Sequence, residues 1–316
     1  MLRWLAMFSM FVDHLGYYLY PYLPNPVYTG MRIIGRFAMP IFAYYLALGY
    51  RRTRNLFYYF LRLLATAVIS QLVIYQTNVI CHYSASFTDF NFVFNLCLGL
   101  LFLAGFELVT RSYPEVIMKL QPAEPSAENP FQLPFHSKET VFGFKLKAIW
   151  GLLLGLIIMG TVILLNFRFD ISYHIYGIGL IWIFYYAEEF RETERQMRFA
   201  FWGLTVLTLL FFAAMYFFPQ LFPQYSPSQF YAILSVPLIY KLSGRQLAAA
   251  KAGAESLPPA EQGSHQARRR AVTERLERQE NRRSSRLLAR CIGYLFYPLH
   301  FYLVLLIRYL YILLFV

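Results

Sequence analysis

The sequence predicts an all-α fold, a polytopic bundle of membrane-spanning helices. Of the 316 residues, 58% are hydrophobic and 19% are aromatic, whereas soluble domains average about 45–50% apolar residues. The apolar residues gather in repeated runs of about 17–25 residues, the length that crosses a hydrocarbon core about 30 Å thick. The segments between these runs alternate between basic and nearly uncharged, which is typical of loops on opposite sides of a membrane.

About nine transmembrane helices are expected, each bounded by polar or turn-forming residues. The nine runs cover 3–22, 31–50, 56–76, 91–110, 148–167, 171–187, 199–218, 226–241 and 291–312. Every second connection is rich in Lys and Arg, beginning with the segment 51–54. Because basic loops stay inside, the N-terminus is predicted to be cytoplasmic and the C-terminus external. We therefore expect a multi-pass protein of the cell's inner (cytoplasmic) membrane, with the lipid bilayer as its first partner.

Two polar segments divide the chain. We expect one helical bundle over 1–242, with eight spans and a cytoplasmic polar loop at about 111–147. A basic cytoplasmic linker follows over 243–290, and the last transmembrane helix, 291–316, packs on the bundle. The linker has almost no apolar face, so an independent domain is not expected there. Its positive charge either lies along anionic lipid headgroups or docks a partner.

Charge and cysteine usage exclude two other classes. The net charge is +12, but the basic residues lie in the loops, where they indicate orientation rather than a nucleic-acid partner. The three cysteines, Cys81, Cys97 and Cys291, are scattered without the spacing of a metal site. The sequence therefore predicts no disulfide framework and no metal.

The first span carries ionisable groups far from either membrane surface. His14 is eleven positions after Arg3, roughly 16 Å deep at a rise of 1.5 Å per residue and close to the midplane. Ionisable groups there cost about 2.5–3.5 kcal/mol each even on lenient insertion scales. We therefore expect Asp13 and His14 to face the protein interior or a watery cavity.

Two further polar residues lie inside predicted spans. His300 is ten positions after Arg290, roughly 15 Å deep and thus level with His14. Two histidines at one depth suit either a shared polar cavity or separate interhelical hydrogen bonds. Arg36 either extends outward beside Arg32, or faces the bundle and pairs with Asp13. A structural ion pair and a catalytic pair predict the same contact.

Motifs along nearly all the spans resemble the TraX family of membrane proteins. They include Asp13-His14-Leu-Gly16, Arg32-Ile-Ile-Gly35-Arg36, Asn91 to Leu100, Asp170 to Gly177, Gln229 to Leu238 and Phe296-Tyr297-Pro298-Leu299-His300. TraX is named for acetylating the N-terminal amine of conjugative pilin. The family is also similar to the wider class of transmembrane acyltransferases, which pass acetyl from cytoplasmic acetyl-CoA to acceptors at or beyond the outer face.

The resemblance implies roles for individual residues. His14 would be the catalytic base or a transient acyl carrier, and Asp13 would orient or balance its imidazole. Arg36 would hold the acid or stabilise the developing oxyanion. His300, with Tyr297, would close the site from the last helix.

The resemblance also implies acetyl-CoA as a co-substrate at the cytoplasmic mouth. Its phosphates would need cationic partners, and the arginines expected there are Arg51, Arg52, Arg54 and Arg62. The leading hypothesis is an integral-membrane acetyltransferase acting on a pilin N-terminal amine or on a cell-envelope acceptor. Two alternatives stay open: a proton-coupled or solute transporter using the Asp13, His14 and Arg36 cluster, or a non-catalytic membrane assembly factor.

Overall fold

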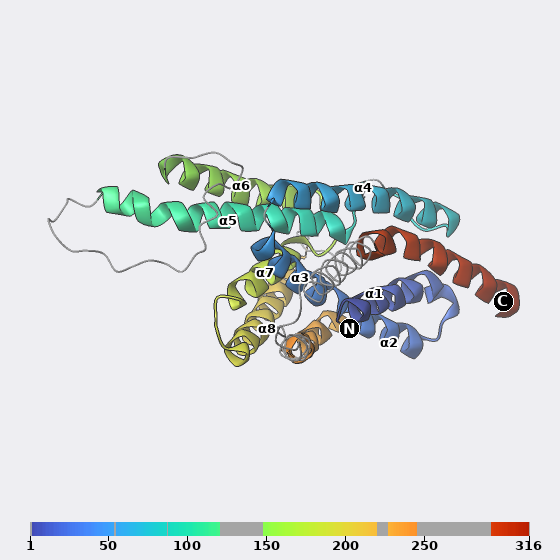
Figure 1. The fold of residues 1–316 in the computed structure, drawn as a ribbon. Helices are drawn as coiled ribbons and strands as arrows, with labels where there is room; N and C mark the ends of the chain where they lie inside the picture. Colours follow the sequence, from blue (N-terminus) through green and yellow to red (C-terminus); the bar gives the residue numbers. More distant parts are fainter. Residues whose placement is uncertain are drawn as a thin grey trace, which may run out of the picture.

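The protein is an all-α bundle in a computed structural model, which describes residues 2–53, 55–86, 88–120, 148–219, 227–244 and 292–315 (Figure 1). The helices are α1 (Leu2–Leu19), η1 (Tyr20–Tyr22), α2 (Asn25–Gly35), α3 (Ala38–Arg52), α4 (Leu56–Ile80), α5 (Phe92–Leu120), α6 (Ala148–Arg168), α7 (His174–Ala187), α8 (Thr193–Phe217), η2 (Pro227–Leu234), helix 235–244 and the last helix, Ile292–Phe315. Two strands of two residues each, β1 (Asp89–Phe90) and β2 (Asp170–Ile171), pair in parallel.

The helices confirm a polytopic membrane protein. Within the described ranges, six helices are long and apolar enough to cross a membrane when α2 and α3 are taken together. They are Asn25–Arg52, α4, the first part of α5 (Phe92–Pro114), α6, α8 and Ile292–Phe315. Helix α7 is shorter, and α1 and the segment 227–244 are not among the six. Helical structure occupies each of the nine predicted spans, while their number as true crossings and the orientation stay predictions.

The second predicted span, 31–50, is not one continuous helix. It begins at Asn25 and is broken between α2 and α3 at Arg36 and Phe37, whose amides donate three residues back, to Ile33 and Ile34. Pro40 explains the break, because it has no N–H to donate and its ring clashes with the carbonyl four residues earlier. Since α2 has eleven residues, the break lies about 16 Å from its N-terminal end. The N-terminus of α3 therefore starts deep in the bundle.

The centre of the bundle is formed by α3, α5 and α7. Helix α7 buries most of its length, including Tyr176, Leu180 and Phe184, against α3 and α5. By contrast, α6, α8 and the last helix leave large apolar side chains exposed on one side, such as Ile157, Leu210 and Leu313. Such continuous apolar faces are expected of helices that contact lipid.

Helices α5 and α6 lie side by side (Figure 1). A Cβ at Gly155 would stand 2.6 Å from the Gly105 carbonyl oxygen, so glycine is what allows the two backbones to approach so closely. Helix α5 continues to Leu120, ten residues past the predicted end of its span. Residues 121–147 of the predicted polar loop, residues 245–290 of the predicted basic linker and residue 291 of the predicted last helix lie outside the described residues.

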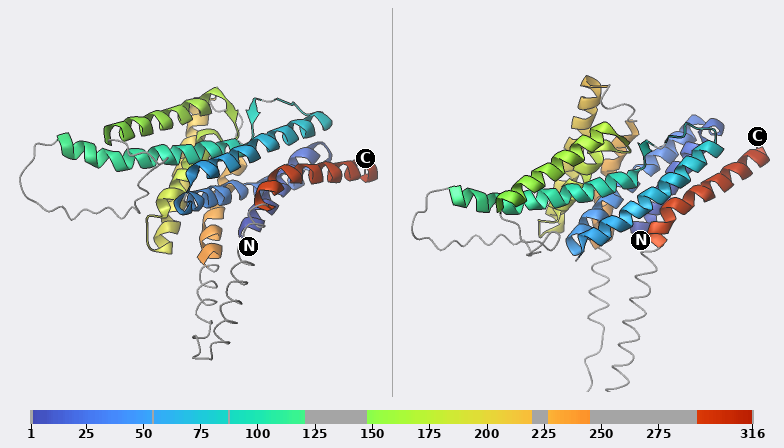
Figure 2. Two further views of the ribbon diagram at one scale, coloured as in Figure 1. Left: turned by 45° about the horizontal axis from the view of Figure 1, so that its top comes forward. Right: turned by 90° about the horizontal axis from the view of Figure 1, so that it is seen from above.

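The last helix lies beside α1 and α4, although it is far from both in sequence (Figure 2). Tyr302 donates a hydrogen bond to Gln76 of α4 at 3.1 Å. Nearer the C-terminus, the Arg308 guanidinium donates to the Cys81 carbonyl and lies over the rings of Tyr22 and Tyr83. These contacts hold the helix that carries His300 against α4 and against the segments that follow α1 and α4.

Candidate active site

His14 of α1 and His300 of the last helix are in direct contact. Their Nδ1 and Nε2 atoms, respectively, lie 2.6 Å apart, a hydrogen-bond distance. The two ring planes are inclined by 17° with centroids 4.9 Å apart. The equal depth counted from the sequence predicted that the two histidines lie at one level, and the contact confirms it.

The hydrogen bonds of His300 determine where the protons of the neutral pair reside. The Nδ1 atom of His300 lies 3.1 Å from the Phe296 carbonyl oxygen, one helical turn earlier. A carbonyl oxygen can only accept, so this nitrogen carries the proton and Nε2 of His300 must accept. His14 therefore donates from Nδ1, and its Nε2 retains a lone pair. A lone pair held in this way suits a general base or a nucleophile.

Aromatic side chains surround the two imidazoles. The Phe301 ring centroid lies 4.7 Å from that of His14, and the Phe296 centroid lies 5.3 Å from that of His300. Tyr297 is buried 6.4 Å from His14, centroid to centroid, and packs edge-on against Phe92. Such walls exclude water, and electrostatic interactions inside them are stronger than in bulk solvent.

Asp13 forms its ion pair with Arg32, at 2.8 Å between Oδ2 and Nη1, rather than the predicted pair with Arg36. Gly35 explains the choice, because a Cβ there would stand 2.0 Å from Asp13 Oδ1. The glycine lets the carboxylate lie directly against α2, and Arg32, three residues earlier, shares that helix face. Arg36 lies beyond the end of α2, where the chain turns. The Asp13–Arg36 ion pair is therefore corrected to Asp13–Arg32.

Arg36 instead binds side chains of η2. It donates from Nε to Ser228 Oγ at 3.1 Å and from Nη1 to Gln229 Oε1 at 3.3 Å. It also hydrogen-bonds Tyr173, which precedes α7 in a left-handed conformation (φ 71°). Arg36 is only 9% exposed, so its side chain faces the bundle rather than the interface.

The Arg36 cluster and the histidine pair are neighbours. Arg36 interacts electrostatically with Asp13, the residue before His14, and Asp13 in turn interacts with Tyr297 of the last helix. The structure thus brings Asp13, His14, Arg36 and His300 into one region, as the sequence predicted. Sequence reasoning missed Arg32, Tyr173, Ser228 and Gln229 as members. In the sequence, the signal for Ser228 and Gln229 was a pair of polar residues at the start of an apolar run.

The predicted cofactor arginines differ in their surroundings. Arg51 forms an ion pair with Glu189, donates to the Tyr185 carbonyl at 2.8 Å and lies over the Tyr185 ring. Arg52 and Arg62 are exposed, with no ion pair among the described residues, and the Arg62 guanidinium lies 5.9 Å from the Tyr59 ring centroid. Arg54 lies outside the described residues.

Glu188 directly follows α7 and lies near Arg51 and Arg52. Burial raises the pKa of its carboxyl group, and the charges of Arg51 and Arg52 act in the opposite direction. The C-terminal end of α3 therefore already has carboxylates close to Arg51. Arg52 and Arg62 are exposed near this end of the bundle.

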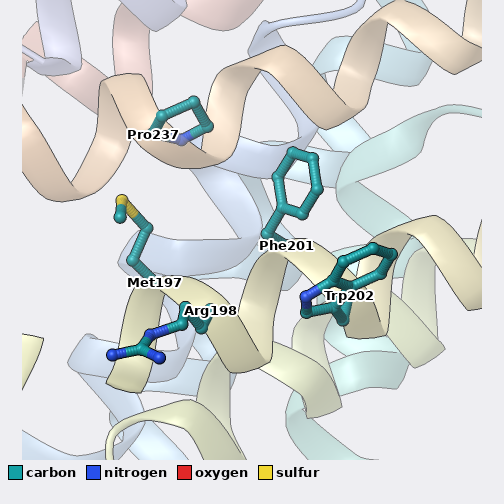
Figure 3. A pocket seen from close by; sticks show the side chains of 5 residues that line it. All are labelled: Met197, Arg198, Phe201, Trp202 and Pro237. Atoms are coloured by element: carbon teal, nitrogen blue, oxygen red, sulfur yellow. The ribbon is translucent and has the colours of Figure 1, made fainter. Parts of the chain in front are cut away.

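The cavity drawn in Figure 3, of about 210 Å³, lies elsewhere. It is lined by Met197, Arg198, Phe201 and Trp202 of α8 and by Pro237 of helix 235–244. Trp202 is 63% exposed, and Arg198 is ion-paired with Glu194 at 2.8 Å. None of the predicted site residues lines this cavity, whose apolar, outward-facing wall is suited to lipid. Within the described ranges, no group of three His, Cys, Asp or Glu residues could hold a metal ion.

Comparison with known proteins places the chain in a family. The family described as TraX protein matches residues 1–254. The chain belongs to the TraX family. The matched region includes Asp13, His14, Arg36 and Gln229, whereas His300 lies beyond it.

The TraX chain is also similar to an uncharacterized protein of Rickettsia prowazekii (strain Madrid E), with 37% identity over 84 residues. That match covers 25% of this chain and 31% of the relative, so the chain spans about a third of the length of the relative it matches. No solved structure matches the chain.

Proposed function

We propose that this TraX-family protein is an integral-membrane acetyltransferase that takes acetyl from cytoplasmic acetyl-CoA. The observation that carries the proposal is the contact between His14 and His300, which leaves a lone pair on Nε2 of His14 inside an aromatic enclosure. Family membership supports the link to pilin acetylation, with a pilin N-terminal amine or a cell-envelope hydroxyl as the acceptor. The proposal includes nine crossings with the N-terminus in the cytoplasm.

The site residues would catalyse the transfer by general acid–base chemistry. The acceptor amine or hydroxyl attacks the thioester carbonyl carbon, and its proton moves to Nε2 of His14. The π electron pair of the carbonyl moves onto its oxygen, forming a tetrahedral oxyanion close to Arg36. When the oxyanion collapses, the C–S bond breaks and the sulfur takes the proton from His14. The products are the acetylated acceptor and coenzyme A thiol.

Acetyl-CoA would reach the site from the inner end of the bundle. Arg52 and Arg62, exposed at the inner end, would bind the coenzyme A phosphates as charge-assisted hydrogen-bond donors. His14 lies eleven residues, or about 16 Å, along α1 from Arg3 at the same end. This separation is comparable with the length of the extended pantetheine arm. The thioester would thus reach the imidazole while its phosphates stayed at the membrane surface.

Purified protein incubated with labelled acetyl-CoA tests the proposal, because water replaces the unknown acceptor in a slow hydrolysis that can be followed. We expect His14→Ala to lower the rate at least about a hundredfold, the lower end of what a general base contributes. His82→Asn changes a histidine in the exposed turn after α4 and serves as the matched control. Equal rates for wild type and His14→Ala would overturn the proposal. Solute uptake into vesicles without any acetyl transfer would favour a transporter.

A further inference from the structure

The cavity between α8 and helix 235–244 is built from residues that have no part in the site around His14. Met197, Phe201 and Trp202 of α8 and Pro237 of helix 235–244 form its apolar wall, which encloses about 210 Å³. Figure 3 shows Met197 and Phe201 extending from α8 toward Pro237. Trp202 is 63% exposed and Pro237 is exposed as well, so the cavity opens on the outer surface of the bundle.

The two segments that enclose the cavity run side by side in opposite directions. Pro237 faces Met197, near the start of α8. Phe230, earlier in the chain than Pro237, stacks on Phe212, later in α8, with ring centroids 4.5 Å apart. Since α8 is long and apolar enough to cross a membrane, its outer surface here contacts lipid.

The cavity is too small for a helix of a partner protein and has the right shape for one acyl chain. A helix with its side chains is about 10–12 Å wide, so a single turn already occupies roughly 400 Å³ or more. An acyl chain is narrower, and an apolar stripe continues from the cavity along α8. This stripe consists of Trp202, Val206 and Leu210, which are all exposed and follow at intervals of four residues.

Charged side chains continue the same face of α8 in the other direction. Glu194, Arg198 and Trp202 are also four residues apart, about 6 Å along the axis at each step. Arg198 donates from Nη2 to Glu194 at 2.8 Å, but both side chains are more than half exposed, so the other N–H groups and the second carboxylate oxygen are open to a ligand. Across the cavity, exposed Lys241 lies one turn beyond Pro237 and has no ion pair among the described residues.

The balance of charge at this end determines which headgroup fits. The segment 188–198 contains three arginines and four glutamates, so it offers no excess of positive charge to an anionic lipid. A headgroup with both a phosphate and an ammonium instead matches an arginine next to a glutamate. The glutamate lies one turn farther from the acyl stripe than the arginine, as the ammonium of such a headgroup lies farther from the acyl chains than its phosphate.

We propose that the cavity binds one phospholipid whose headgroup ends in a primary ammonium, of the phosphatidylethanolamine class. One acyl chain fills the cavity, the phosphate accepts hydrogen bonds from Arg198 and Lys241, and the ammonium donates to Glu194. The trimethylated ammonium of phosphatidylcholine has no N–H and cannot make the last contact. The inference does not depend on the proposed acetyl transfer. Because the segment 227–244 also supplies the side chains that bind Arg36, the lipid holds that segment against α8.

Reconstitution into phosphatidylcholine bilayers tests the assignment. A minor fraction of the lipid carries brominated acyl chains, which quench tryptophan fluorescence on contact, beneath an ethanolamine, a choline or a glycerol headgroup. The part of the fluorescence that is missing in Trp202→Phe reports on the cavity. We expect brominated phosphatidylethanolamine to contact Trp202 about fivefold more readily than brominated phosphatidylcholine at the same mole fraction, the upper end of what an exposed ion pair contributes.

Glu194→Gln removes the carboxylate that receives the ammonium and leaves the phosphate-binding side chains in place. We expect it to abolish the preference for ethanolamine over choline. Glu192→Gln is the matched control, because Glu192 also pairs with an arginine of α8, Arg195, at 2.8 Å and does not line the cavity. Both glutamates are exposed, so both variants should keep the thermal midpoint of the wild type.

Loss of the preference in Glu194→Gln alone supports the site. Loss in both variants, or a preference that survives in Glu194→Gln, would overturn it. Equal contact for the three headgroups in the wild type would mean that bulk lipid covers the cavity, and the strongest contact for the glycerol headgroup would assign it to anionic lipid. Absence of quenching by any lipid would show that protein covers the cavity. Each of these three results refutes the proposal.

Discussion

The protein contains two polar clusters, one at the level of His14 and one around Arg51, Glu107 and Glu189, here called the inner cluster. The two differ in how their polar groups are paired. In the inner cluster, Glu107 pairs with Arg111 and accepts from the Tyr50 hydroxyl, while Arg51 pairs with Glu189. Charges there are matched by opposite charges, within α5 for Glu107 and Arg111 and between α3 and the turn after α7 for Arg51 and Glu189. At the level of His14, the hydrogen bonds that run from the Phe296 carbonyl through His300 end in a lone pair on Nε2 of His14.

The difference separates two uses of polarity inside a membrane protein. Matched pairs remove the cost of burying charge and hold helices together. A buried polar group with an unpaired lone pair still carries part of the desolvation cost, unless a ligand or a reaction intermediate hydrogen-bonds to it. The open lone pair of His14 is therefore the feature from which we expect chemistry, although the ion pairs of the inner cluster carry more charge.

Among the variants that test this comparison, His300→Leu is expected to lower activity most. It removes the acceptor of the His14 Nδ1 proton. Without it, the imidazole of His14 is free to rotate and to hold its proton on Nε2, where the lone pair is needed. We expect the rate of acetyl-CoA turnover to fall about 10–100-fold, less than for His14→Ala, as when a residue that fixes a ligating histidine is removed.

His300→Gln provides the control for a positioning role, because its amide oxygen can accept the same proton. Partial recovery of the rate relative to His300→Leu, with an unchanged thermal midpoint, is the expected result. Equal loss in both variants would show that His300 acts by packing alone. Full activity in His300→Leu would contradict the coupling of the two histidines.

Gly35→Ala should disturb the same cluster through packing. The added Cβ would stand 2.0 Å from Asp13 Oδ1, so the Asp13–Arg32 pair must shift or α1 and α2 must separate. Overpacking of this kind costs about 1–3 kcal/mol in the free energy of unfolding. Gly30→Ala, on the same helix with nothing within 4 Å of the new Cβ, is the matched control. Equal thermal midpoints for the two variants would refute the close approach.

Part of the site could be predicted by counting residues. The rise of an α-helix is constant, so the depths of His14 and His300 follow from their distance to the nearest arginine. The choice between Arg32 and Arg36 could not be predicted in this way, because the two lie one turn apart and the absence of a side chain at Gly35 decides between them. The partners of Arg36 were equally hidden, since Ser228 and Gln229 are 192 and 193 positions away.

The fold, like the site, could be predicted only in part. The apolar runs predicted the helices because a segment in lipid must satisfy its backbone hydrogen bonds internally, whichever helices it packs against. The break between α2 and α3 depends on Pro40, which the hydropathy pattern of 31–50 conceals. The pairing of Arg51 with Glu189 joins segments 138 positions apart, so a basic loop was expected where the structure has an ion pair.

Glu188→Gln should give the smallest effect and tests the inner cluster. Burial raises the pKa of Glu188 above its ordinary value of 4.5, so the ionised carboxylate is less stable in the folded protein than in the unfolded chain. Its contribution to stability is therefore favourable below that ordinary value and is lost as the pH rises through the folded pKa. Glutamine carries no such charge, so the variant should have a slightly higher thermal midpoint near neutral pH. This gain should vanish in acid.

Unfolding of detergent-purified protein, followed at several pH values, measures the difference. Glu189→Gln is the matched control, because it removes the partner of Arg51 and should lower the midpoint near neutral pH. Opposite signs for these adjacent glutamates would show that the inner cluster is balanced by Glu189 and that Glu188 is the surplus charge. A lower midpoint for both variants would mean that the two arginines stabilise Glu188 by more than burial costs it. Both carboxylates would then belong to the matched network.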